Sequence, residues 1–194
     1  MGIDSLGKNY EAFATRTGAA GKSAYQEQFV VLPDSWRELV KKPNKTQADI
    51  DRIDSEYKKG FINFGQSYIK HLDKTYGDGN GELTIDEYVK SQMAPLSDEY
   101  KNDTEFIQAA KNSFHNINVD GGKTLNAKEI TALLSMFDMD VEKGGGINGK
   151  IKAYDTLAFT LSLIESPDSE MGQIMKERIT ERYQSIFSKQ YPIK

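Results

Sequence analysis

The stretch from Asp73 to Glu87 constrains the fold of this chain most, because oxygen-bearing side chains alternate with glycines there. With Glu87 as the last loop position, Gly81 falls at the sixth, where the chain turns sharply, and Leu83 at the apolar eighth. Hard divalent cations are held by several oxygens from positions spaced in this way. The pattern predicts a calcium loop between two helices, with ligands from Asp73, Asp78, Asn80, Glu82 (through its backbone carbonyl), Thr84 and Glu87.

The first ligand position of this loop can be assigned in two ways. Strict counting places Tyr76 there, and a neutral phenol is a poor calcium ligand. Ile69 and Leu72, by contrast, have the spacing of an apolar helix face that ends at Asp73. We therefore predict Asp73 as the first position, with about three extra residues before Asp78. The alternative is an acidic, glycine-rich turn that binds no metal.

A second loop has the full spacing without an insertion. Its predicted ligands are Asn118, Asp120, Thr124 and Glu129. Gly122 stands at the fifth position and offers no side-chain oxygen, and Lys123 stands at the turn position. Because it has fewer negative charges and a nearby cation, we predict weaker calcium binding here.

A third acidic segment is interrupted by a glycine-rich insertion. Its candidate ligands are Asp138, Asp140, Asn148 and Asp155. About six extra residues separate its two halves, and ordering them costs conformational entropy. Aspartate at the last position also reaches less far than glutamate. The sequence therefore favours a loop without metal here, and a cation site is the alternative.

The N-terminal region contains the remains of a similar loop between residues 16 and 27. Gly21 and Glu27 would hold its sixth and twelfth positions. Arg16 and Gly18 stand where the first ligands are required, and neither can bind a cation. We predict an inactive loop that keeps only the helix–loop–helix shape.

Helices are predicted wherever apolar residues recur every three or four positions. The longest runs from about Thr46, a cap residue, to Leu72. Thr84 and Asn126 each precede a glutamate by three residues, the pattern of a capping box, so an exit helix should start at each. Two glycines interrupt the longest helix and indicate close packing or a bend: Gly60 and Gly65.

Composition narrows the class of protein. The chain has 194 residues, of which 38% are hydrophobic and 28% charged, as in folded soluble proteins. It has no cysteine, which excludes thiolate metal sites and is compatible with a reducing, cytoplasmic compartment. A net charge of −4 argues against nucleic-acid binding and fits a cation-binding protein. No apolar run is long enough for a membrane span. With 2 histidines and no cysteine, no nucleophile–base pair is visible, so an enzyme is not expected.

The motifs together resemble those of EF-hand proteins of the sarcoplasmic calcium-binding protein and calerythrin type. Helix–loop–helix units fill the chain, and residues 78–87 match the loop motif closely. The tail from Gly149 through Pro167 to Gly172 is similar to the final hand and C-terminal segment of that family. The resemblance implies an all-α fold of helix–loop–helix pairs in one compact, two-lobed unit.

Under this resemblance, residues 1–95 form an N-terminal pair, and residues 96–194 form a C-terminal pair with an extra helix. Short antiparallel contacts at the eighth loop positions would join Ser23 to Leu83 and Leu125 to Ile151. The expected function is a soluble calcium buffer or sensor, with Ca²⁺ as ligand, Mg²⁺ as an alternative, and a target peptide or helix for a sensor. The alternatives are a helical adaptor with vestigial loops and a small-ligand-binding EF-hand protein.

Overall fold

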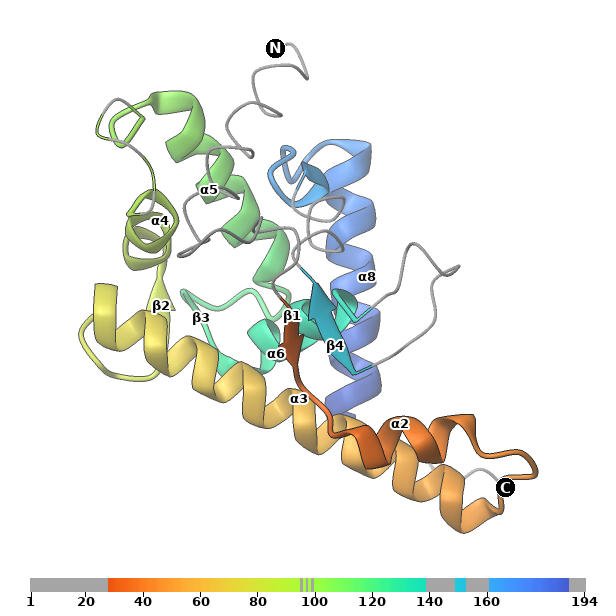
Figure 1. Cartoon of the computed structure of the whole chain (residues 1–194). Helices are drawn as coiled ribbons and strands as arrows, with labels where there is room; N and C mark the ends of the chain where they lie inside the picture. Colours follow the sequence, from red (N-terminus) through yellow and green to blue (C-terminus); the bar gives the residue numbers. More distant parts are fainter. Residues whose placement is uncertain are drawn as a thin grey trace.

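The computed structural model describes residues 28–94, 96, 98, 100–138, 149–152 and 161–188. This part of the chain is predominantly helical, which confirms the predicted all-α class at that level (Figure 1). Its elements in chain order are β1 (Gln28–Val30), α2 (Asp34–Lys41), α3 (Gln47–Tyr76), β2 (Leu83–Thr84), α4 (Ile85–Met93), α5 (Thr104–Ile117), β3 (Thr124–Leu125), α6 (Ala127–Met136), β4 (Lys150–Lys152) and α8 (Glu170–Phe187). None of the described helices has the length and apolar character that a membrane crossing requires.

The long helix α3 begins at the predicted cap. The Thr46 hydroxyl accepts a hydrogen bond from the Asp49 amide at 3.2 Å, and the Asp49 carboxylate accepts one from the Thr46 amide at 2.8 Å. The helix was predicted to end at Leu72, but it continues to Tyr76. Residues 74–76 contain no helix breaker, so the helix extends until Gly77, whose amide closes the last turn on the Asp73 carbonyl at 2.8 Å.

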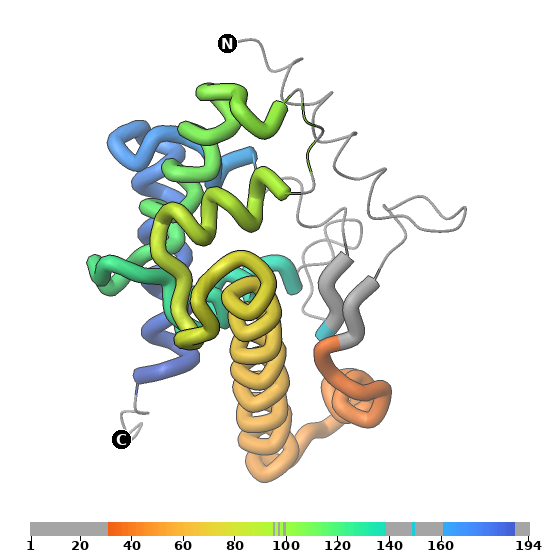
Figure 2. The backbone as a smooth tube through the Cα atoms, turned by 90° about the vertical axis from the view of Figure 1, so that its left-hand side faces the viewer, coloured from red at the N-terminus to blue at the C-terminus, as the bar shows by residue number. Residues whose placement is uncertain are grey.

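Helix α6 is the central element of the core. Every residue from Glu129 to Asp138 is buried, because α6 lies between α3 and α8. A β-carbon on Gly65 of α3 would collide with the Thr131 side chain and stand 2.9 Å from the Thr131 α-carbon. The predicted close packing at Gly65 is therefore confirmed, since the missing side chain lets the two helix backbones approach. Figure 2 shows α2 set to the side, next to the N-terminal half of α3.

Two short antiparallel strand pairs join segments that are far apart in sequence. In one pair Leu83 of β2 faces Leu125 of β3, and in the other Phe29 of β1 faces Ile151 of β4. The prediction that Leu125 pairs with Ile151 is wrong, and so is the prediction that Ser23 pairs with Leu83. Ser23 itself lies outside the described residues.

The length of α6 explains this exchange of partners. Leu125 precedes the helix and Ile151 follows it in the chain. A helix of 10 residues is about 15 Å long, whereas paired strands lie about 5 Å apart. The Gly149 amide donates to the Asp138 carboxylate at 2.8 Å, which holds β4 at the C-terminal end of α6. The first and second loops, which α4 and α5 connect, lie side by side instead, and their strands β2 and β3 pair.

The hydrophobic core draws on both sides of the predicted boundary at residue 95. Phe61 and Ile69 of α3 belong to the same buried cluster as Ile117, Ile130 and Ile179 from the second half of the chain. The division into residues 1–95 and 96–194 stays a prediction. In the structure, helices and strands from the two sides share this cluster.

Candidate metal centre

Three carboxylates from separate elements converge at the junction of α3 and α4. Each of Asp73, Asp78 and Glu87 offers a carboxylate oxygen, and these oxygens all lie within 4.8 Å of one another. Asp73 comes from the last turn of α3 and is only 1% exposed, Asp78 from the loop, and Glu87 from the first turn of α4. Among the predicted ligands of the first loop, these three are the carboxylates that the fold brings together.

Backbone amides of the loop orient the Asp73 side chain. Its Oδ1 accepts a hydrogen bond from the Gly79 amide at 2.9 Å, and its Oδ2 accepts one from the Gly81 amide at 2.6 Å. Both glycines have positive φ values, 83° and 91°, which turn their amides inward with little backbone strain. The Tyr76 ring instead packs against the hydrophobic core. This geometry favours Asp73 over Tyr76 as the first loop position.

A capping box holds the Glu87 carboxylate at the start of α4, as the sequence predicts. Glu87 Oε2 accepts hydrogen bonds from the amide and the hydroxyl of Thr84, both at 2.9 Å. In return, the Thr84 hydroxyl accepts from the Glu87 amide at 3.4 Å. Helix α4 therefore starts where the last candidate ligand stands. The cap and the candidate site use the same two residues.

Asn80 and Glu82 make contacts that spacing alone did not indicate. The Asn80 side-chain oxygen accepts a hydrogen bond from the Glu82 amide at 2.8 Å. The Glu82 carboxylate accepts one at 2.6 Å from the hydroxyl of Thr124, a residue of the second loop. Glu82 and Thr124 therefore link the two loops through their side chains, beside the backbone pairing of β2 with β3.

Gly77 is a site residue that the sequence reasoning missed. A β-carbon at this position would collide with Asp73 Oδ1 and stand 3.2 Å from the carboxyl carbon of Glu87. The space between these two carboxylates therefore depends on the absence of a side chain at residue 77. The sequence did show a glycine in the insertion after Asp73. That a side chain is not tolerated there became clear only from the packing of Asp73 and Glu87.

In the second loop, Asn118 has one amide hydrogen bond and one unpartnered oxygen. Its Nδ2 donates to the Gly122 carbonyl at 2.8 Å, and the residue is only 5% exposed. Its Oδ1 has no hydrogen-bond partner among the described residues. The Asp120 carboxylate, which is exposed, accepts from the Gly122 amide at 2.8 Å and from the Asn126 side chain at 3.0 Å.

Glu129 is fully buried inside the second loop. Its Oε1 accepts hydrogen bonds from the amides of Val119 at 2.9 Å and Asp120 at 3.3 Å, and its Oε2 accepts one from the Asn126 amide at 3.1 Å. The last contact completes the predicted capping box at Asn126. Burial raises the pKa of Glu129 to about 7, although the amide hydrogen bonds act in the opposite direction. A cation at this loop would have to compete with these amides for the carboxylate.

Of the third segment, the structure describes Asp138 and residues 149–152. Asp138 is fully buried, and its Oδ1 accepts from the Gly149 amide at 2.8 Å. Gly149 has a φ of 72°, so this pair repeats the relation between Asp73 and Gly81. Its other candidate ligands, Asp140, Asn148 and Asp155, lie outside the described residues, as does the predicted inactive loop at residues 16–27.

No family model, curated protein or solved structure matches the chain. The case for an EF-hand therefore rests on the spacing of the loop residues and on the loop geometry above.

Proposed function

We propose that the chain is a calcium-binding protein of the EF-hand type, with its principal site between Asp73 and Glu87. The observation that carries the proposal is the convergence of the Asp73, Asp78 and Glu87 carboxylates within 4.8 Å. Calcium is bound at about 2.3–2.6 Å from each oxygen, so two ligands on opposite sides of one ion lie about 5 Å apart. The separation of the three carboxylates fits this requirement.

The charge of the site also supports a cation. Three carboxylates this close repel one another in water, and a divalent ion at their centre removes that repulsion. The Gly79 and Gly81 amides orient Asp73, and the capping box orients Glu87, so part of the ordering cost is met before any ion binds. Mg²⁺ is the alternative ion, but it keeps several waters and demands an octahedral shell.

The second loop would supply a weaker site. The unpartnered, buried Oδ1 of Asn118 fits a ligand role at the first position. Against this, both oxygens of Glu129 already accept backbone hydrogen bonds, and the raised pKa of Glu129 disfavours the ionised form that a cation needs. The hydrogen bond between Thr124 and Glu82 would make the two loops respond together.

The positions of the methionines bear on the choice between a buffer and a sensor. A sensor often opens a methionine-lined groove when calcium binds. Met136 and Met175 are buried in the core, at 7% and 2% exposure, and Met171 is exposed. Met136 and Met175 therefore fill the interior in this structure, and a sensor would expose them on binding calcium, whereas a buffer would not. The adaptor with vestigial loops is the competing function, and it predicts no calcium binding.

Isothermal titration with calcium tests the proposal on the wild type and on two matched variants. Glu87→Gln removes one ligand charge, and we expect calcium affinity at the principal site to fall by about tenfold or more. Asp86→Asn removes the same charge from the neighbouring exposed position of the same helix turn and should leave the affinity within about threefold. Thermal melting with and without calcium gives an independent readout, because an ion that binds the native state raises the melting temperature.

Two results would contradict the assignment. One is a wild type that binds no calcium at millimolar concentration, which would favour the adaptor. The other is an equal loss of affinity in both variants, which would show a general effect of charge and no ligand role for Glu87.

A further inference from the structure

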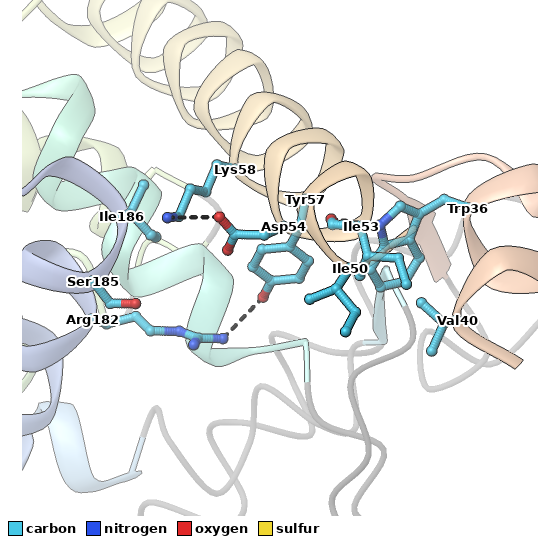
Figure 3. Close-up of a pocket in the computed structure, with 10 residues that line it drawn as sticks. All are labelled: Trp36, Val40, Ile50, Ile53, Asp54, Tyr57, Lys58, Arg182, Ser185 and Ile186. Carbon is cyan, nitrogen blue, oxygen red and sulfur yellow. Dashed lines mark hydrogen bonds and ion pairs between the residues drawn. The ribbon is translucent and has the colours of Figure 1, made fainter. Parts of the chain in front are cut away.

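A pocket of about 320 Å³ lies between α2, α3 and α8 (Figure 3), and none of the candidate metal ligands lines it. Trp36 and Val40 of α2, Ile50 and Ile53 of α3, and Ile186 of α8 form its apolar walls. Its volume is at the lower end of the range for small-molecule sites, and apolar walls with a few polar groups are typical of them. Ile50 is 47% exposed, so an apolar ligand would cover surface that now faces water.

Arg182, a cation that lines this pocket, forms no ion pair with the carboxylates of the described residues. Arg182 of α8 donates from Nη2 to the Tyr57 hydroxyl at 2.9 Å and to the Ser135 carbonyl at 3.3 Å, and from Nε to the Ser135 hydroxyl at 3.2 Å. No described carboxylate lies within ion-pair distance of its guanidinium, and its Nη1 makes no hydrogen bond to the described residues. Figure 3 shows the guanidinium directed toward Tyr57.

Arg182 is the group in this pocket that is best placed to bind an anion, because the other charged residues of the lining are paired with each other. Lys58 is paired with Asp54 at 2.9 Å, so these two residues neutralise each other at the rim. The pKa of the Tyr57 hydroxyl is raised mainly by burial, and the nearby Asp138 carboxylate raises it further. The Tyr57 hydroxyl is also where Arg182 donates, and it keeps the guanidinium in a fixed orientation. A guanidinium held in this way keeps the two N–H groups of Nη1 for a ligand, and a carboxylate can accept a charge-assisted hydrogen bond from them.

We propose that this pocket binds a small monocarboxylate with an apolar body, whose carboxylate contacts Arg182 and whose body lies against Ile50, Ile53 and Trp36. The inference goes beyond the proposed calcium function and does not depend on it. The apolar walls select the body, and the guanidinium distinguishes an acid from the corresponding alcohol or amine.

The chain carries its own reporter for this site, because Trp36 is its single tryptophan and lines the pocket. The experiment titrates decanoate, and separately decanol, into metal-free protein and follows tryptophan emission, with isothermal titration as the second readout. Metal-free buffer is required because calcium precipitates long-chain carboxylates. We expect saturable binding of decanoate and binding of decanol that is about tenfold weaker or less.

Three variants locate the binding site. Arg182→Met keeps an apolar stem without the charge and should weaken decanoate binding by about tenfold or more, with little effect on decanol. Arg182→Lys should give an intermediate affinity, since it keeps the charge but loses the planar guanidinium that Tyr57 and Ser135 orient. Arg178→Met, the matched control, removes an exposed charge one turn earlier on the same helix and should bind as the wild type does.

Loss of the Arg182 contacts to Ser135 could unfold the chain, so circular dichroism melting accompanies each variant. Ile50→Glu provides a test that leaves Arg182 intact, because it places an anion at the exposed mouth and should weaken decanoate more than decanol. The proposal is overturned if the wild type does not bind decanoate, or if decanol binds as tightly. It is also overturned if folded Arg182→Met or Ile50→Glu keeps the wild-type affinity for decanoate.

Discussion

At the scale of single residues, the candidate metal centre depends on positions that carry no ligand. Gly79 and Gly81 supply the amides that orient Asp73, and Gly77 leaves the space between Asp73 and Glu87. The three carboxylates therefore converge around amides and a space that these glycines supply. Glu129 likewise depends on its neighbours, because backbone amides orient its carboxylate and burial raises its pKa.

Gly77→Ala should weaken calcium binding by about tenfold or more, because a methyl group would intrude between Asp73 and Glu87. Calcium titration measures the effect. The control is Lys74→Ala in the same turn, which is exposed and should bind calcium nearly as the wild type does. Equal affinity in Gly77→Ala and the wild type would show that the space between these carboxylates has no role in binding.

The metal-free protein should lose stability between pH 5 and pH 7 through Glu129. Its pKa in the folded state is about 7, above the ordinary value of 4.5, so folding favours the neutral form. This contribution is fully present below pH 4.5 and is lost as the pH rises through 7, with a total of about 3 kcal/mol at most.

Urea unfolding at a series of pH values, in the presence of a chelator, measures this dependence. Glu129→Gln should reduce it, because glutamine does not ionise in this range. Glu170→Gln, which alters an exposed residue in the first turn of α8, should keep the wild-type dependence. Identical pH profiles for Glu129→Gln and the wild type would be inconsistent with a shifted Glu129.

At the scale of elements, capping boxes and close helix contacts set the positions of the loops. The boxes at Thr84 and Asn126 start α4 and α6 where the last loop residues must stand. The close contact between Gly65 and Thr131 sets the distance between α3, which leads into the first loop, and α6, which follows the second. Helix α6 is buried from Glu129 to its last residue, Met136, and Glu129 near its start and Asp138 just beyond its end both accept hydrogen bonds from loop amides.

Gly65→Ala and Gly60→Ala form a matched pair on α3. Both gain about 1 kcal/mol of helix propensity. In Gly65→Ala the new methyl meets the Thr131 backbone and side chain, so we expect a net loss of about 1–3 kcal/mol in the free energy of unfolding. In Gly60→Ala it meets mainly the flexible end of Leu32, so the net change should be smaller than about 1 kcal/mol.

Denaturant unfolding of the two glycine variants gives both values. An equal effect at the two positions would mean that the approach of α3 to α6 is not tight at Gly65.

At the scale of the whole molecule, the core and the strand pairs connect the two halves of the chain. Leu83 and Leu125 are both fully buried and pair across the predicted boundary, and α3 packs on α6. A half of the chain on its own would expose the buried faces of these elements. The unit that folds cooperatively should therefore be larger than either half.

Separate fragments 1–95 and 96–194 should fail to show a cooperative thermal transition, and an equimolar mixture should regain part of one. Circular dichroism melting of each fragment, of the mixture and of the full chain measures this. Cooperative melting of either fragment alone, at the temperature of the full chain, would show that the shared cluster contributes little to its stability.

Local features of the fold could be predicted from the sequence because their causes lie within about fifteen residues of one another. The cap at Thr46, the capping boxes at Thr84 and Asn126, and the helices that follow them depend on neighbouring side chains and backbone groups. The assignment of Asp73 to the first loop position also came from a local pattern, the apolar face of the helix before it. The contacts of Asp73 with Gly79 and Gly81 agree with that assignment.

The partners of Leu83 and Leu125 were decided by the tertiary structure alone. Local spacing marks both leucines as strand residues at the eighth position, but it carries no information about which strands can meet. That choice follows from the length of α6, which keeps Leu125 and Ile151 at its opposite ends, and from the shared core of α3 and α6. The role of Gly77 was decided in the same way, because the space it leaves exists only once α3 and α4 bring Asp73 and Glu87 together.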